Sequence, residues 1–391
     1  MYPAGDQKGE LRLSPLVNPN AKVPAASGGV LPNQVQDPMA AKTYMGWDFG
    51  GAHIKVAKVG NSGRLLGVEQ IPCPLWQGLD VFDQALGSVV NEIHGDAHAV
   101  TMTGELADIF PNRCEGVRRL LERSMAVLGD VPLSVYAGKA GFVAAADSAR
   151  YCHEIASANW HASAHLAARY CDCGILVDIG STTTDIVEFS RGEVCFRGYT
   201  DAERLASEEL VYTGVIRTPV YAVVSRAPFR GEWQAVTAER FATMADVYTL
   251  TGELHEPALG VLALRETADG GGSDFEACAR RLARMLGRDA DAGEADKWRG
   301  LARYIARVQR DRIQQALERM FSRRPTAQSL PLVGAGVGRF IVRDLASQIG
   351  HPYIDFSSLL PEAGAYAEGA AICAPAVAVA YLIQDHPWVR A

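Results

Sequence analysis

The stretch DIGSTTTD, residues 178–185, combines carboxylates, hydroxyls and a glycine in a pattern suited to holding a phosphate and a metal ion. Gly180 lets the backbone approach an anion closely, and successive main-chain N–H groups in such a turn form a concave set of donors. Asp178 and Asp185 repel phosphate and therefore favour a cation such as Mg²⁺, which proteins hold through one or two carboxylates plus substrate phosphates. The hydroxyls that can also donate to phosphate oxygens belong to Ser181, Thr182, Thr183 and Thr184.

A second copy of this pattern lies earlier in the chain, at DFGGAHIK, residues 48–55. When the two stretches are aligned, Asp48 matches Asp178 and Lys55 falls at the position of Asp185. Both stretches interrupt alternating apolar residues with a glycine turn, which is typical of a β-hairpin. The chain therefore contains an internal repeat, and Lys55 adds a positive charge to the predicted site. The first turn comprises Gly50, Gly51, Ala52 and His53.

A third glycine-rich turn follows a short apolar strand and precedes a predicted helix, in the sequence LPLVGAGVGRF, residues 330–340. Taken alone, such a turn is as readily a simple strand-to-helix connection as a phosphate loop. Asp48 and Asp178 taken alone could be ordinary turn residues. The duplicated hairpins followed by this turn favour a phosphate-binding site. The residues of this third turn that we expect to bind phosphate are Gly334, Ala335, Gly336 and Gly338.

Composition limits the classes of function that the chain can have. It has 391 residues, of which 48% are hydrophobic, so it can bury the core of two domains or two lobes. Its net charge of −7 provides no electrostatic footprint for nucleic acid or an anionic membrane. The eight cysteines include no Cys-x-x-Cys pair and the start resembles no signal peptide, so we expect a cytoplasmic location. Residues 1–42 lack periodicity and are expected to form a disordered leader.

The rest of the chain has the periodicities of alternating helices and strands. Residues 365–383 are apolar but contain Glu368 and Pro375, which favours one buried helix over a membrane span. The cysteines and histidines between residues 152 and 173 match no common zinc-finger spacing and are expected on helix surface and in the core. The pattern predicts a strand at 98–103 and helices near 80–94, 114–128, 150–170, 277–287 and 298–322, the last two with a solvated arginine face.

The motifs WDFGGAHIK, VDIGSTTTDI and VGAGVG resemble the phosphate-1, phosphate-2 and adenosine motifs of the actin, sugar kinase and Hsp70 superfamily. More narrowly, ADVYTLTGEL, ETADGGGSDFEACARRLARMLGRD and YTGVIRTPV resemble hydantoinase/oxoprolinase-like proteins linked to tetrahydromethanopterin-dependent C1 transfer. Archaeal members of that group are methanofuran-biosynthesis synthases. The resemblance implies a two-lobed α/β, ribonuclease H-like fold with a central cleft. Lobe one would comprise 43–165 and 366–391, and lobe two 171–365.

This resemblance also implies a reaction. A methanofuran- or methylofuran-type synthase joins an aminomethyl-furanmethanol diphosphate to the phenol oxygen of tyrosine, tyramine or a glutamylated derivative and releases diphosphate. Mg²⁺ on Asp48 and Asp178 would hold that diphosphate without adenine, and a base would activate the phenol. The implied catalytic residues are Asp48, Lys55, Asp178, Asp185 and Asp246. The implied substrate-binding residues in the family-specific region are Arg217, Thr218, Glu253 and Asp269, of which Glu253 and Asp269 are, with Asp246, candidates for the base.

Two other functions use the same phosphate turns. One is an ATP-dependent small-molecule kinase or hydantoinase-like enzyme, which needs space for adenine beside residues 334–338. The other is a nucleotide-dependent structural or interaction protein, because fold alone does not fix function. The expected partners are small-molecule substrates rather than nucleic acid or membrane, and the sequence leaves a homo-oligomer open.

Overall fold

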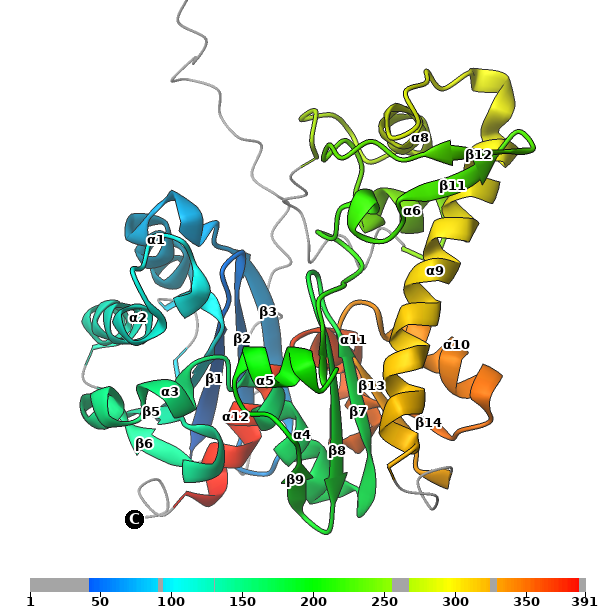
Figure 1. The fold of residues 1–391 in the computed structure, drawn as a ribbon. Coiled ribbons are helices and arrows are strands. Elements are labelled where there is room, and N and C mark those ends of the chain that lie inside the picture. Colours follow the sequence, from blue (N-terminus) through cyan, green and yellow to red (C-terminus); the bar gives the residue numbers. More distant parts are fainter. Residues whose placement is uncertain (1–41, 91–93, 130, 255–266, 324–328, 387–391) are drawn as a thin grey trace, which may run out of the picture. The chain divides into compact units, whose positions relative to one another are not determined.

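The computed structural model describes residues 42–90, 94–129, 131–254, 267–323 and 329–386, which belong to one compact unit. Almost all of the predicted leader, residues 1–41, lies outside the described residues. Within the unit, two mixed β-sheets carry helices on their faces (Figure 1), so the predicted α/β class is confirmed.

The first sheet has six strands in the order β3-β2-β1-β4-β5-β6. Hairpin β1–β2 and strand β3 are antiparallel, whereas β4 and β5 run parallel to β1. Its strands are β1 Thr43–Phe49, β2 His53–Gly60, β3 Leu65–Pro72, β4 Ala97–Met102, β5 Leu133–Tyr136 and β6 Phe142–Ala144. Its helices are α1 Leu79–Val90 and α2 Arg113–Leu128, which pack on each other, and the buried α12 Ala374–Leu382, which packs on β1, β2 and β4.

The second sheet repeats the order of the first, with β10-β8-β7-β13-β14 and β9 also paired to β8. Hairpin β7–β8 is again antiparallel, and β13 and β14 are again parallel. The predicted internal repeat is therefore confirmed as a repeat of strand topology. The strands are β7 Cys173–Ile179, β8 Thr184–Ser190, β9 Glu193–Cys195, β10 Leu210–Val211, β13 Leu332–Ala335 and β14 Tyr353–Asp355.

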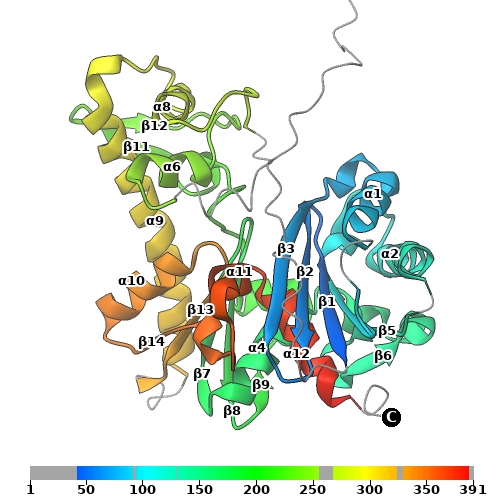
Figure 2. The same ribbon diagram turned by 180° about the vertical axis from the view of Figure 1, so that it is seen from behind.

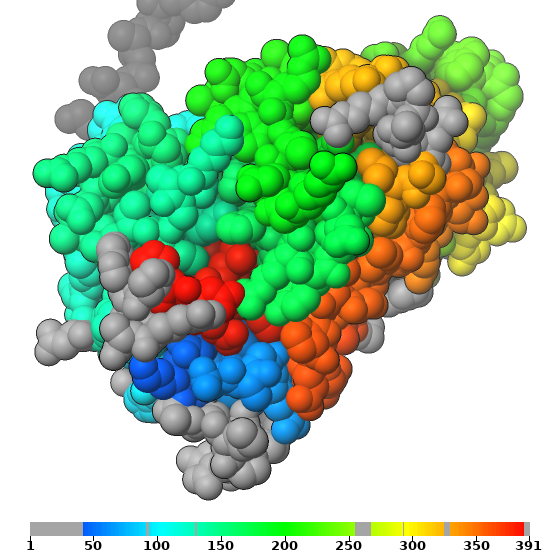
Figure 3. All heavy atoms as spheres, turned by 90° about the horizontal axis from the view of Figure 1, so that it is seen from below, coloured from blue at the N-terminus to red at the C-terminus, as the bar shows by residue number. Residues whose placement is uncertain are grey.

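Helices α4, Asn159–Tyr170, and α12 pack on each other between the two sheets. The backbone of α12 comes so close to β1 that a Cβ on Gly46 would lie 2.0 Å from the carbonyl oxygen of Ala376. Figure 3 shows the last described residues (red) beside the first strands (blue) and residues of the second sheet (green). Helix α4 also packs on β7 and β8, which follow it in the chain. The predicted lobe boundaries stay a prediction.

A smaller region between β10 and α9 has its own hairpin, β11 Arg226–Phe229 and β12 Glu232–Ala235 (Figure 2). Phe229 stacks on Trp298 with a centroid distance of 4.7 Å, which joins this hairpin to α9. The helices here and around the second sheet are α5 Asp201–Ala206, α6 Met244–Thr251, α8 Phe275–Arg284, α9 Ala295–Phe321 and α10 Arg339–Ile349.

Two helix predictions were wrong in detail. The apolar stretch 365–383 is not one helix: α11, Ala367–Ile372, and α12 are separate, and Pro375 lies in the first turn of α12, where its missing N–H is tolerated. Residues 150–170 also contain a break, because Ser157 has a φ of +55° between α3, Cys152–Ile155, and α4. Among the described helices none alone is long and apolar enough to span a membrane, although the pair Gly364–Ile372 and Ala374–Asp385, bent by 112°, passes a test of length and composition.

Candidate functional site

The turns of the two repeated hairpins line one cleft of about 660 Å³. In the first hairpin Asp48 is the strand partner of Lys55, and in the second Asp178 is the partner of Asp185, so Lys55 and Asp185 occupy equivalent positions. The predicted residues that line this cleft are Asp48, Gly50, Gly51, Ala52, His53, Lys55, Asp178, Gly180, Ser181, Thr182, Thr183, Asp185 and Arg217. Thr184 lies outside it, because its buried hydroxyl donates to the carbonyl oxygen of Thr213.

Both turns have the same backbone geometry. The N–H of Gly50 donates to the carbonyl of His53 at 3.0 Å, and the N–H of Gly180 donates to the carbonyl of Thr183 at 2.9 Å. The four N–H groups inside the turns, from residues 51, 52, 181 and 182, have no acceptor among the described residues. The buried hydroxyl of Ser181 also has no partner there. Such an arrangement of free donors favours an anion between the two turns.

The negative charges of Asp48 and Asp178 in the cleft are only partly balanced by neighbouring cations and hydrogen-bond donors. Asp48 is buried and contacts Lys55 Nζ through Oδ2 at 3.5 Å, but its Oδ1 has no partner among the described residues. Burial raises the pKa of Asp48, and Lys55 counteracts that rise. Burial raises the pKa of Asp178 to about 7, with Lys55 lowering it and the charges of Asp185 and Asp48 raising it further.

This donor set fits Mg²⁺. An orphaned carboxylate oxygen on Asp48 and a half-buried carboxylate on Asp178 are the hard oxygen ligands that Mg²⁺ prefers, and the rest of its shell would be water and substrate phosphate. Asp185 is less available, because Arg204 Nη1 lies 2.8 Å from its Oδ1. Arg204 is itself buried, and its guanidinium lies 4.0 Å from the centre of the Trp160 ring.

The raised pKa of Asp178 predicts pH-dependent Mg²⁺ binding. Since only the carboxylate form binds the cation, a pKa of about 7 should make the apparent affinity about tenfold higher near pH 8 than near pH 6. Calorimetric titration with MgCl₂ in buffers of different ionisation enthalpy measures both the affinity and the protons released. Burial also raises the pKa of Glu105 to about 7, but Glu105 does not line the cleft. If the pH dependence persists in Asp178→Asn, it does not come from Asp178.

The third glycine-rich turn offers fewer free donors than the two hairpin turns. The N–H of Gly336 donates to the carbonyl of Ala371, and that of Gly338 donates to the carbonyl of Ile179, each at 2.8 Å. Gly334 and Ala335 belong to β13 and are buried. A Cβ on Gly336, whose φ is +80°, would lie 2.4 Å from Asp178 Oδ1. The predicted phosphate contacts of these four residues stay a prediction, and the bond from Gly338 to Ile179 joins the turn to the end of β7.

A smaller cavity of about 190 Å³ adjoins the cleft and shares Ala52, His53 and Ser181 with it. Its walls include Trp76, which follows β3, and two arginines, Arg217 and Arg240. The guanidinium of Arg217 lies 5.3 Å from the centre of the Trp76 ring. No carboxylate of the described residues forms an ion pair with either arginine. This annex, as we call the smaller cavity, suits an aromatic group that carries or adjoins an anion.

The candidate bases are all paired with arginines. Asp246 lines the annex, but its Oδ1 accepts from Arg281 Nη2 at 2.7 Å and its Oδ2 accepts from the Thr243 N–H at 2.9 Å. Arg281 is buried, which corrects the prediction of a solvated arginine face on this helix, and it also contacts Asp269.

The other predicted substrate contacts lie outside both cavities. Glu253 forms an ion pair with Arg310, and the Thr218 hydroxyl accepts from the Gly214 N–H at 2.8 Å. Asp269, like these two, lines neither the cleft nor the annex. Of the four predicted substrate-binding residues, only Arg217 reaches the site.

Some lining residues were missed by the sequence analysis. Gln70, Trp76, Trp160, Arg204 and Arg240 line the cleft, yet none belongs to a recognisable motif. Buried Nε1 of Trp160 and Oε1 of Gln70 have no partner among the described residues, which adds free polar atoms to the site. Trp76 is 39% exposed, and this exposure of a large aromatic side chain can be seen only in the folded chain.

The profile of the hydantoinase/oxoprolinase family matches residues 96–386. The chain is 28% identical over 341 residues to (4-{4-[2-(gamma-L-glutamylamino)ethyl]phenoxymethyl}furan-2-yl)methanamine synthase of Methanocaldococcus jannaschii, covering 87% of this chain and 97% of the relative. It is 28% identical to the synthase of the same name of Methanococcus vannielii, covering 45% of this chain and 75% of the relative. A nucleotide-free structure of acetone carboxylase aligns with a TM-score of 0.50 at 11% identity, covering 87% of this chain and 70% of that one. This likeness is one of fold, and it agrees with the expected α/β architecture of two mixed sheets with flanking helices.

Proposed function

Because the chain belongs to the hydantoinase/oxoprolinase family, with relatives named as synthases of a phenoxymethyl-furan, we propose that it is an ether-forming synthase of methanofuran- or methylofuran-type cofactor biosynthesis. It joins an aminomethyl-furanmethanol diphosphate to the phenol oxygen of tyrosine, tyramine or a glutamylated derivative. The observation that carries this proposal is the convergence of two donor-rich turns and two under-compensated aspartates on one cleft with an aromatic annex.

In this reaction the bond between the furfuryl carbon and the diphosphate oxygen breaks, and its electron pair leaves with diphosphate. The phenol oxygen forms the new bond to that carbon and loses its proton. The free N–H groups of the two turns and the Ser181 hydroxyl bind the diphosphate oxygens and stabilise the charge that develops on them. Mg²⁺, when held by Asp48 and Asp178, supplies further stabilisation of the leaving group.

His53 is the best-placed group to take the phenol proton. It lines both the cleft and the annex, and its buried Nε2 has no partner among the described residues. Burial, together with the nearby cations Lys55 and Arg217, lowers its pKa to about 4, so the imidazole is neutral at pH 7. A bound diphosphate brings negative charge between the two turns and raises that pKa, which makes His53 a stronger base only when the substrate is present.

The proposal predicts a product that forms without ATP. Purified protein incubated with Mg²⁺, the furanmethanol diphosphate and a tyrosine-like phenol should release inorganic diphosphate and yield an aryl furfuryl ether, which mass spectrometry detects. Neither ADP nor monophosphate should form. In parallel, calorimetry should show that inorganic diphosphate with Mg²⁺ binds at least as tightly as ATP.

Omitting Mg²⁺ or the phenol provides the control for this assay. If ether appears only once ATP is added, the function is the ATP-dependent alternative. Slow ATP hydrolysis with no small substrate present points to a nucleotide-dependent structural or interaction protein. The occupied N–H groups of Gly336 and Gly338 support the reaction without ATP, because they leave fewer donors for a nucleotide at that turn.

A further inference from the structure

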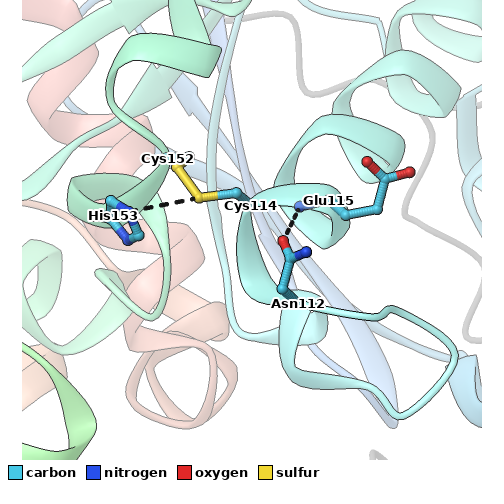
Figure 4. The surroundings of a disulfide bond; sticks show 5 residues. All are labelled: Asn112, Cys114, Glu115, Cys152 and His153. Atoms are coloured by element: carbon cyan, nitrogen blue, oxygen red, sulfur yellow. Dashed lines mark hydrogen bonds between the residues drawn. A yellow bond between two sulfur atoms is a disulfide. The ribbon is translucent and has the colours of Figure 1, made fainter.

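The first turns of α2 and α3 lie beside each other, and their cysteines, Cys114 and Cys152, form a disulfide (Figure 4). The two residues are 38 positions apart in the chain. The six remaining cysteines of the sequence are all described, and none of them forms a disulfide. No sequence spacing pointed to this pair, since it arises from the packing of two helices that are distant in the chain.

The surroundings of Cys114 favour a reactive thiol. It lies in the first turn of α2, which is capped by the Asn112 side chain accepting from the Glu115 N–H at 2.9 Å (Figure 4). Nε2 of His153 lies 3.9 Å from Cys114 Sγ. A helix N-terminus and a neighbouring imidazole both stabilise a thiolate, which is the nucleophile in thiol–disulfide exchange. Both cysteines are only half-buried and His153 is exposed, so small thiols can reach the bond.

Residues next to both cysteines contact the chain that follows the second hairpin. Arg113, adjacent to Cys114, forms an ion pair with Asp201 at 2.7 Å. Glu154, two residues after Cys152, accepts at its carbonyl from the Tyr199 hydroxyl at 2.5 Å. Asp201 begins α5, which also supplies Arg204, the partner of the cleft residue Asp185. The disulfide therefore joins α2 to α3 beside the two contacts that these helices make with Tyr199 and Asp201. The same segment, through Arg204, forms part of the cleft wall.

The same segment leads directly into the cleft. Ser157 lies five residues after Cys152, lines the cleft, and donates to the buried carboxylate of Glu105 at 2.9 Å. Asn159 and Trp160 follow and also line the cleft. Loss of the crosslink would free α3 from α2 and so increase the mobility of residues that contact both Tyr199 and the cleft.

We propose that Cys114 and Cys152 are a reversible thiol-modification site that is oxidised by low-molecular-weight disulfides and controls the contact between α3 and residues 199–206. The Cys114 thiolate attacks the small disulfide, forms a mixed disulfide and releases one small thiol. Cys152 then attacks the Cys114 sulfur, forms the internal disulfide and releases the second thiol. Two protein thiols are oxidised and one small disulfide is reduced to two thiols, so electrons and protons balance. In a reducing compartment, disulfides are mostly transient and redox-sensing, as this site requires.

The test uses the full chain and needs no substrate. The protein is equilibrated in buffers with a graded ratio of oxidised to reduced glutathione, and free thiols are alkylated and located by mass spectrometry. Cys114 and Cys152 should be protected together in one two-electron step. Amide hydrogen exchange should be about tenfold faster at residues 152–158 and 199–206 in the reduced protein than in the oxidised protein. Cys114→Ser should show the fast exchange in every buffer, whereas the control Cys171→Ser should respond as the wild type does.

Three results would overturn the proposal. Cys114 and Cys152 could stay fully alkylated across the glutathione series, or exchange at residues 199–206 could be equal in the oxidised and reduced wild-type protein. Alternatively, the reduced protein could retain Zn²⁺ and resist oxidation until a chelator is added. That outcome would assign the convergent sulfur and nitrogen atoms of Cys114, Cys152 and His153 to a metal site instead. Because none of these readouts measures ether formation, failure here leaves the proposed function untouched.

Discussion

We expect Asp178→Asn to lower Mg²⁺-dependent turnover about 10²- to 10³-fold, because in the proposed reaction this carboxylate binds the cation at the leaving diphosphate. The amide keeps the size of the side chain, so the contact with the Gly336 turn is preserved. The measurement is the rate of diphosphate release at saturating substrate over a range of Mg²⁺ concentrations. Unchanged turnover with an unchanged Mg²⁺ requirement would show that Asp178 does not bind the metal.

Stability provides an independent readout for the same variant. Burial raises the folded-state pKa of Asp178 from 3.8 to about 7. A raised pKa contributes stability that is complete below the unfolded value of 3.8 and is lost as pH rises through about 7. Near pH 8 the ionised aspartate therefore costs stability that asparagine does not, and Asp178→Asn should melt at a higher temperature than the wild type. The matched control Asp172→Asn, an exposed residue just before β7, should change neither property.

His53→Gln should lower kcat about 10²- to 10³-fold while diphosphate binding changes little, because a positioned proton acceptor typically contributes that much to the rate. Glutamine retains a hydrogen-bonding side chain but cannot accept the proton. The split between kcat and the affinity for Mg²⁺-diphosphate distinguishes loss of a base from loss of a phosphate contact. If affinity falls and kcat is retained, His53 binds phosphate, as the sequence motif alone suggested.

In contrast to His53→Gln, we expect Asp246→Asn to reduce stability more than kcat. Asp246 is buried against Arg281, and removing one partner of a buried ion pair costs about 3–5 kcal/mol because the other charge is left uncompensated. We therefore expect a large loss in the free energy of unfolding, measured with urea, and a smaller loss of kcat in the protein that remains folded. A loss of kcat as large as that of His53→Gln, at unchanged stability, would restore Asp246 as the base.

Local pattern alone predicted the two hairpins and the equivalence of Asp48 with Asp178 and of Lys55 with Asp185, which the strand register confirms. Register within a hairpin is set by the turn and by the alternation of apolar residues, and both depend only on a few residues that are consecutive in the sequence. Long amphipathic helices such as α2 and α9 were predicted for the same reason. The two glycine turns of the hairpins could therefore be identified before any tertiary structure was known.

Only the tertiary structure decided which charged and sulfur-containing side chains meet. Packing of separate elements brings together three pairs: Asp185 with Arg204, Asp246 with Arg281, and Cys114 with Cys152. The periodicity of the sequence does not predict such contacts. The same holds for the annex, whose walls come from the turns of both hairpins, from the segment after β3 and from the region around α6. Short motifs specify a turn through local sterics, but the neutralisation of a buried charge depends on which distant helix the core positions beside it.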